Sequence, residues 1–323
     1  MLDGNKNLIM RSLIKNQKTK IVSYLTVMVI FFGLVSCYDD YIKDYDYTAV
    51  YFGTQRPLRT LVARTGSEYL EFRIGVALGG VRENVKGYTA EFMLDPELLN
   101  TIDGANKFTL LPESCYSIEN ANNTFIIPKG KVLGDCPVKI NKNDFVNLPG
   151  SLDNTYALPV RLLSTTADSI RDGKDYTIIV IKYIDEHSGY YFKKGWQAEW
   201  DGTVIDPETT IEYDLSENKI RMLTTRSLTQ YTMHGMGIHG NANGTADAGD
   251  RLLINLVSGV VTLETNSGSN VIEDLGSGYN PNEKLFILNY IYTKGGKKYK
   301  VSEELYLRQD VEKELRFEPW LSK

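Results

Sequence analysis

Histidine is scarce in this chain, with three residues among 323. Two of them, His234 and His239, lie five positions apart, so on an extended strand their side chains point to opposite faces. That geometry does not suit two ligands of one zinc ion. The asparagines and aspartates that follow lack the spacing of a calcium-binding loop. We therefore expect no metal site and no cofactor.

Catalytic motifs are missing as well. The sequence contains no nucleophile elbow, no H-E-x-x-H, no Cys/His pair and no Walker loop. Residues 235–240 read G-x-G-x-x-G, but a dinucleotide site needs a helix after that motif, and loop-forming residues follow here. We expect a protein without catalytic residues. A glycan hydrolase stays open as an alternative, because two carboxylates suffice for that chemistry.

The apolar run at residues 21–35 is too short to cross a membrane. Its 15 residues, apolar apart from Ser23 and Thr26, fall short of the roughly 20 that a spanning helix needs. A basic flank before a short apolar core is typical of a secretory signal peptide, which we assign to residues 1–36. Translation starts at Met1 or at Met10. The basic residues before the run are Lys6, Arg11, Lys15, Lys18 and Lys20.

An excess of basic charge is also absent. Without residues 1–36, the chain keeps 31 basic and 40 acidic residues, a net charge of −9. An acidic body repels nucleic acid and anionic surfaces, and no basic patch with interleaved aromatic residues opposes this. We expect no nucleic-acid partner, and a neutral ligand fits the charge better.

The most specific motif that is present ends at Cys37. Leu34-Val35-Ser36-Cys37 resembles the lipobox of bacterial lipoproteins. The resemblance implies cleavage before Cys37 and acylation of that residue, and several acyl chains hold a protein at a membrane far more firmly than one does. The acidic segment 37–47 resembles the surface-export signal of Bacteroidetes lipoproteins, with a plain solvated tether as the alternative. The expected location is the outer membrane, at the cell surface.

Cys115 and Cys136 are the two other cysteines. In an oxidising compartment they can form a disulfide that stabilises the fold by roughly 3 kcal/mol. Two buried free thiols are the alternative, because the sequence does not give the separation of these residues in space.

Strand patterns dominate residues 48–186. Apolar and polar residues alternate in 70–78, 88–94 and 156–162, as in strands with one face in a core. Residues 176–183 are nearly all β-branched or aromatic, which predicts a strand covered on both faces. Short strands separated by turn residues predict an all-β fold that begins with an immunoglobulin-like β-sandwich.

The polar segment after Ile184 separates a second domain, which we place at residues 187–323. Residues 285–292 and 298–308 flank a glycine-containing turn and predict a hairpin. Further strands are expected at 211–215, 220–224, 252–256 and 260–263. Consecutive antiparallel hairpins predict a lipocalin-like β-barrel or a second sandwich.

Several motifs resemble the N-terminal module of a large family of Bacteroidetes surface lipoproteins of unknown function. The resemblance covers about residues 50–184, and it continues more weakly into the second domain from Gly189. It implies an immunoglobulin-like domain followed by a lipocalin-like one. It also implies a glycan-binding accessory of polysaccharide-utilisation systems, beside an outer-membrane glycan importer, but it transfers no binding residues. The motifs are Tyr51–Gln55, Arg59–Thr60, Leu78–Asn84, Leu110–Pro112 with Tyr116, Ile126–Gly130 and Tyr156–Arg161.

Sugar binding needs flat aromatic faces together with hydrogen-bonding groups. Trp196 and Trp200 share one face of an extended strand, because their separation is even, and both are candidates. Tyr231, beside the glycine-rich loop, is expected to be exposed and is the third. Aromatic side chains in β-domains are more often core than platform, and we expect Trp320 to pack.

We therefore expect a lipid-anchored surface protein that binds a poly- or oligosaccharide through its second domain, with the first domain as a spacer. One alternative is an adhesion or scaffold module that binds another protein. The other is a carrier of an apolar ligand in the barrel interior.

Overall fold

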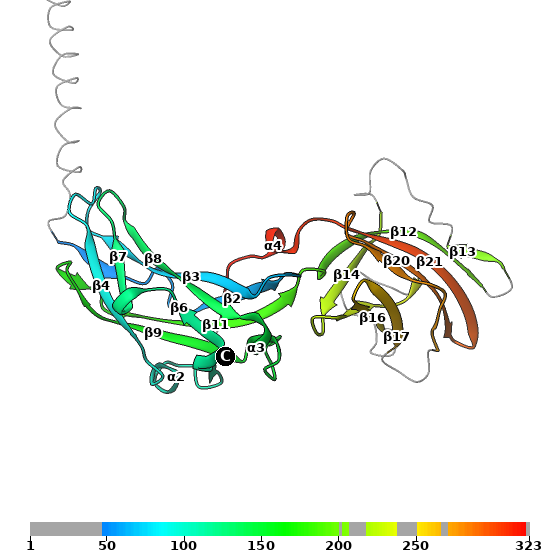
Figure 1. The fold of residues 1–323 in the computed structure, drawn as a ribbon, viewed down its shortest axis with the longest axis horizontal. Coiled ribbons are helices and arrows are strands. Elements are labelled where there is room, and N and C mark those ends of the chain that lie inside the picture. The colour runs from blue at the N-terminus through cyan, green and yellow to red at the C-terminus, as the bar shows by residue number, and fades with distance from the viewer. Residues whose placement is uncertain (1–46, 200–201, 207–217, 238–250, 266–270, 321–323) are drawn as a thin grey trace, which may run out of the picture. The chain divides into compact units, whose positions relative to one another are not determined.

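The computed structural model describes residues 47–199, 202–206, 218–237, 251–265 and 271–320, and these residues form an all-β protein (Figure 1). Two curled sheets pack as a sandwich-like first domain, and a closed antiparallel barrel of eight strands follows. The predicted fold class is confirmed, and of the two architectures expected for the second domain the structure has the barrel.

The first sheet of the sandwich has five strands in the order β10-β1-β3-β8-β6. Leu70, Ile74, Val76 and Leu78 of β3 are buried, as the alternation predicts, because side chains two residues apart share a face. The strands are β1 (Ala49–Tyr51), β3 (Tyr69–Gly79), β6 (Tyr116–Ile118), β8 (Leu133–Asn141) and β10 (Ser169–Ile170).

The second sheet has seven strands in the order β22-β2-β11-β9-β4-β7, with β5 beside β9. Proline has no amide hydrogen to donate to a sheet. Pro159 lies where the neighbour on one edge of β9 changes from β5 to β4, so no ladder hydrogen bond on that edge requires this hydrogen. The strands are β2 (Pro57–Ala63), β4 (Tyr88–Leu94), β5 (Thr109–Leu110), β7 (Thr124–Ile127), β9 (Tyr156–Thr165), β11 (Tyr176–Asp185) and β22 (Glu318–Pro319).

Strand β11 is covered on both faces, as its composition predicts. Short helices lie in the connections: α2 (Leu98–Thr101), η1 (Glu113–Cys115), η2 (Ala121–Asn123), α3 (Lys142–Val146) and, later in the chain, α4 (Val311–Glu314). A buried cluster forms over one face of β11 from Leu58, Leu98, Leu99, Ala105, Phe108, Ala157, Ile178, Val180 and Trp320.

Two polar residues of the sequence motifs have structural roles. Buried Asn84 donates to the carbonyls of Pro128 and Lys131 and accepts from two backbone amides of its own turn. Arg161 bonds Asp95 at 2.6 Å and Asp175 at 2.8 Å. Both residues therefore stabilise the first domain.

The barrel closes because β21 pairs with both β12 and β20. Around the barrel the order is β12-β14-β15-β16-β17-β19-β20-β21, and β13 and β18 lie beside β12 and β20. The bounds are β12 (Gly189–Glu199), β13 (Val204–Asp206), β14 (Ile220–Thr225), β15 (Gln230–His234), β16 (Arg251–Val257), β17 (Val260–Thr265), β18 (Glu273–Asp274), β19 (Gly278–Asn280), β20 (Leu285–Lys294) and β21 (Lys297–Leu307).

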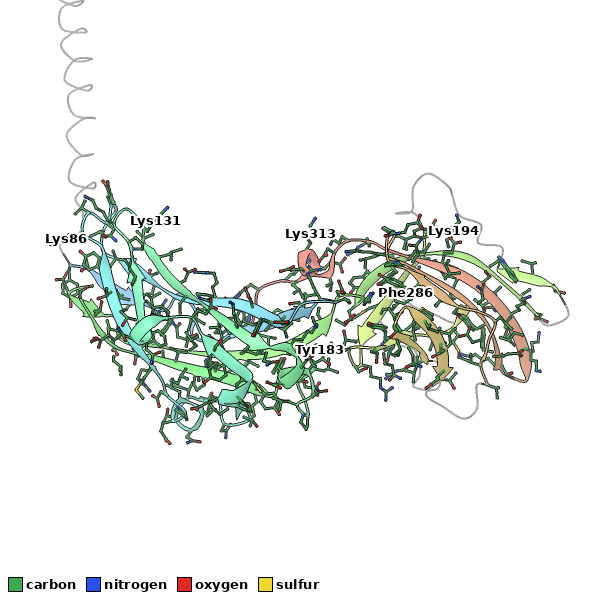
Figure 2. All side chains as sticks on the ribbon, viewed as in Figure 1. Lys86, Lys131, Tyr183, Lys194, Phe286 and Lys313 are labelled. Atoms are coloured by element: carbon green, nitrogen blue, oxygen red, sulfur yellow. The ribbon has the colours of Figure 1, made fainter. Side chains whose placement is uncertain are left out.

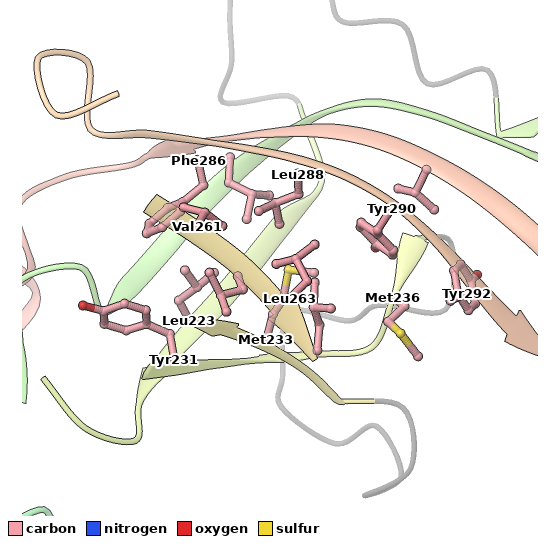
Figure 3. Packing of buried hydrophobic residues seen from close by; sticks show 14 of the residues in the cluster. Leu223, Tyr231, Met233, Met236, Val261, Leu263, Phe286, Leu288, Tyr290 and Tyr292 are labelled. Atoms are coloured by element: carbon pink, nitrogen blue, oxygen red, sulfur yellow. The ribbon is translucent and has the colours of Figure 1, made fainter. Parts of the chain in front are cut away.

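Apolar side chains from every side of the barrel meet in its interior (Figure 3). The predicted strands at 220–224, 252–256, 260–263 and in the 285–308 hairpin are confirmed, while the one expected at 211–215 lies outside the described residues. Leu223, Met233, Ile254, Leu263, Phe286 and Leu288 belong to this core.

Candidate functional site

Trp196 lies on the outer wall of the barrel, in β12. Its partner across the β12–β21 ladder is Ser302, whereas the next residue, Gln197, faces Val301. Gln197 and Val301 are buried, and Trp196 is 39% exposed. Because side chains alternate along a strand, this register directs the indole away from the core. Figure 2 shows Lys194, two residues earlier on the same face, on the outside of the barrel.

A groove of about 640 Å³ lies beside the indole of Trp196. Val204 of β13 and Lys300 of β21 contribute to its lining. Glu199 accepts a hydrogen bond from Lys297 Nζ at 2.8 Å, which fixes its carboxylate at one end. The lining residues are Trp196, Ala198, Glu199, Gly202, Val204 and Lys300.

The strand that carries Trp196 is fixed from its inner side. Tyr292 Oη donates to Gln197 Oε1 at 3.1 Å. Further along, Tyr290 Oη donates to Glu303 Oε1 at 2.7 Å and accepts from the backbone amide of Gly237 at 2.9 Å. Burial, and then the Glu303 carboxylate, raise the pKa of Tyr290, so the hydroxyl stays protonated and available as a donor.

Two basic side chains lie beside these buried hydrogen-bonded residues. Lys193 Nζ lies 3.9 Å from Glu303 Oε2, and Arg221 donates to the carbonyl of Gly237 at 2.9 Å. All three charged residues are 1–2% exposed. These three residues were not predicted from the sequence, although Glu303 lies between the core residues Val301 and Leu305 in a strand with every second residue inward.

The expectation that Tyr231 is exposed is wrong. Its side chain is 0% exposed in β15, and its hydroxyl donates to Asp185 Oδ1 at 2.7 Å. Burial, followed by the Asp185 carboxylate, raises the pKa of Tyr231. A ring enclosed in the core cannot stack on a sugar, so Tyr231 belongs to the packing of the barrel.

The other residues singled out in the sequence have varied positions. Cys115 lies in η1 and Cys136 in β8, and the structure has both as free, buried thiols. Burial raises the pKa of both. Trp200, His239 and the lipobox with Cys37 lie outside the described residues. His234 is half-buried in β15, and burial and then Arg251 lower its pKa.

Trp320 packs, as expected, but in the core of the first domain. Its indole nitrogen donates to the carbonyl of Ile178 at 2.6 Å, and its ring meets Phe108 edge-on at 5.1 Å. Trp320 directly follows β22, which pairs with β2 at Pro57 and Leu58.

The residues that the structure describes contain neither a metal-binding cluster nor a helix suited to span a membrane. No cluster of three or more His, Cys, Asp or Glu side chains suited to a metal ion occurs among them. None of the helices they form is long and apolar enough to pass through a membrane.

The first domain is similar to a known family of domains. A family model described as an N-terminal domain matches residues 45–169, which is less than half of the chain. The family resemblance predicted from the motifs is thus confirmed for this domain. No curated protein matches the sequence.

Solved structures from Bacteroides are similar to this chain over most of its length. A protein of unknown function from Bacteroides ovatus is 18% identical, with a TM-score of 0.61, over 82% of this chain and 95% of its own. A multidomain protein from the same species that includes a domain of unknown function has a TM-score of 0.40 at 13% identity, over 81% and 94%. An auxiliary nutrient binding protein from Bacteroides thetaiotaomicron has a TM-score of 0.38 at 15% identity, over 77% and 90%.

Proposed function

We propose that this protein binds a glycan in the groove beside Trp196, without chemistry of its own. The observation that carries the proposal is the 39% exposed indole of Trp196 on a rigid strand of the barrel wall. An indole face suits the C–H face of a sugar ring, which is apolar while the edges of the ring are polar. In this groove Glu199 offers hydrogen-bond acceptors and Lys300 offers donors for sugar hydroxyls.

The rigidity of β12 supports the proposal. A binding group held on a strand with hydrogen-bonded inner neighbours loses little conformational entropy when a ligand arrives. The alternative of an apolar-ligand carrier is less well supported, because buried side chains converge in the interior of the barrel (Figure 3). A scaffold module would use a large flat patch, whereas the surface beside Trp196 is hollowed into a groove.

Affinity gel electrophoresis against a panel of neutral polysaccharides tests the proposal. The full chain with Cys37→Ser, which removes the expected acylation, should be retarded by at least one glycan. Trp196→Ala should weaken that binding roughly tenfold, because the aromatic contact and its buried area are lost. Trp196→Phe should recover part of it.

Tyr47→Ala is the matched control, because Tyr47 is an aromatic residue 61% exposed in another part of the chain. Retardation that Trp196→Ala and Tyr47→Ala leave equally unchanged would remove Trp196 from the site. Release of reducing sugar during the assay would favour the glycan hydrolase.

We further propose that a lipid on Cys37 anchors the protein in the outer membrane at the cell surface, where it serves a glycan importer. The lipobox and the acidic segment after it support this. Several acyl chains on one residue suffice for permanent attachment. Such tethering raises the local concentration of glycan near an importer.

Metabolic labelling with a fatty-acid probe checks the anchor. The wild-type chain should incorporate the probe, and the Cys37→Ser chain should not. Cys136→Ser is the control and should be labelled like the wild type. Equal labelling of the wild-type and Cys37→Ser chains would contradict the anchor.

A further inference from the structure

Strands β2 and β3 follow each other in the chain but belong to different sheets. On one side β2 pairs with β11, and on the other it pairs with β22 only at Pro57 and Leu58. Strand β3 pairs with β8 along 69–77 and with β1 only at 77–79. The remaining edges of β2 and β3 face each other without pairing in the described part of the chain.

Two hollows lie between these edges, and we call them together the β2–β3 groove. The smaller has a volume of about 260 Å³ and is bounded by residues that include Pro57, Arg73, Val76 and Asp135. The larger, of about 570 Å³, is bounded by residues that include Glu68, Glu71 and Tyr69. Arg59 of β2 lines both hollows and is the residue they share.

The arginines at the two ends of the groove are neutralised. Arg64 bonds Asp310 at 3.0 Å and Glu312 at 2.7 Å. Arg73 forms two bonds of 2.8 Å to Asp135.

Arg59 differs from both. Its guanidinium lies 5.9 Å from the centre of the Phe317 ring, and no carboxylate of the described residues forms an ion pair with it. Burial lowers its pKa, which reports a charge that is partly removed from water and not offset by an anion. A guanidinium placed in this way between hollows has its forked donors available for a bidentate anion.

We propose that the β2–β3 groove binds an acidic sugar, a uronic acid unit of a glycan, through its carboxylate on Arg59. The smaller hollow carries two arginines and one aspartate, so its net charge attracts an anion. The larger hollow has the 44% exposed ring of Tyr69, with Glu68 and Glu71 as acceptors for the hydroxyls of adjoining sugars. The first domain is then a second binding domain instead of a spacer. The inference takes its ligand class, a glycan, from the proposed function.

Isothermal titration with trigalacturonate and with its neutral methyl ester tests this, on the full chain with Cys37→Ser. The free acid should bind at least tenfold more tightly than the ester. Arg59→Gln should weaken binding of the acid at least tenfold and leave the ester unchanged, because the loss is that of a charge-assisted pair. Arg59→Lys, which keeps the charge but not the fork, should fall between.

Arg316→Gln is the matched control. Arg316 is exposed, lies one residue before Phe317 and lines neither hollow, yet its replacement changes the net charge equally. Equal binding of acid and ester, or equal effects of Arg59→Gln and Arg316→Gln, would overturn the proposal. Tighter, Arg59-dependent binding of an aspartate-rich peptide would overturn it as well, by assigning the groove to a protein partner. If Arg59→Gln does not fold, Arg59→Lys decides, and undiminished binding of the acid then refutes it.

The two proposed glycan sites can be tested independently of each other. Trp196→Ala should leave trigalacturonate binding in the β2–β3 groove unchanged. Trp196-dependent binding of a neutral glycan, together with trigalacturonate binding that is absent or that Arg59→Gln does not weaken, would refute this inference and leave the proposed function standing.

Discussion

Gly195 precedes Trp196 in β12 and lies opposite Glu303 of β21. Its φ of +140° lies in a region that other residues rarely adopt, and an added Cβ would lie 2.1 Å from the carbonyl oxygen of Ser302. Gly195→Ala should therefore lower the free energy of unfolding by roughly 2–4 kcal/mol, from backbone strain and a clash with backbone atoms. Urea unfolding followed by circular dichroism measures this.

Gly259→Ala separates the clash from the strain. Gly259 has a φ of +82°, but nothing lies within 4 Å of an added Cβ. This change should cost only about 1 kcal/mol, the price of the left-handed backbone alone. Equal losses in the two variants would contradict a close crossing at Gly195.

The sequence alone did not predict which single side chains are exposed. Because side chains alternate along a strand, Trp196 and Gln197 must face opposite sides of β12. Which of the two faces outward becomes known only from the register with β21. Tyr231 lies near a loop in the sequence, yet it belongs to the five-residue strand β15, in which its ring faces the interior of the barrel. Exposure depends on partners that are distant in the chain, and no local pattern records them.

At the scale of the element, Asp310 fixes the segment that leads from the barrel to β22. Its carboxylate caps α4 by accepting from the amide of Glu312 at 3.0 Å, and it accepts two hydrogen bonds from Arg64. The bonds from Arg64 lower the pKa of Asp310 from 3.8 to about 2.

A carboxylate whose pKa is lower in the folded than in the unfolded state stabilises the fold at pH values above its unfolded-state pKa. This stabilisation disappears as the pH falls through the folded-state pKa. Asp310→Asn should therefore lower the free energy of unfolding by about 1 kcal/mol at pH 6, with solvent screening taken into account. The difference should shrink below about pH 4 and vanish near pH 2. Unfolding curves at several pH values show this. A difference that stayed constant with pH would refute the assignment.

Long strands were predictable and short ones were not. The alternation in β3 and the β-branched run in β11 identify both strands from the sequence, because each buries a regular set of side chains. Strands of two or three residues, such as β5 and β10, contain no period to detect. They exist because a long neighbour supplies hydrogen-bond partners. The groove beside Trp196 depends on such a piece, β13.

At the scale of the molecule, the last described residue completes the core of the first domain. Trp320 is 3% exposed, and its ring fills the space between Phe108 and Arg56. Trp320→Ala should lower the free energy of unfolding by about 3–5 kcal/mol, because it leaves a cavity and an unpaired carbonyl on Ile178. Denaturant unfolding measures the loss.

Hydrogen exchange should locate that loss. Amides of β2 and β11 should exchange faster in Trp320→Ala, whereas those of β16 and β17 in the barrel should not. Phe317→Ala, with a ring 56% exposed, should change stability by less than about 1 kcal/mol. Faster exchange confined to the barrel would contradict this role of Trp320.

The pairing of β22 with β2 also means that the barrel is joined to the first domain at both of its ends, through β11 at its start and through β22 at its close. A protease that cuts once in a barrel loop would thus release neither fragment: the leading piece would stay covalently attached, and the trailing piece would remain bound by its tryptophan. A chain built in this way can be cut once in a barrel loop and still keep its two domains together.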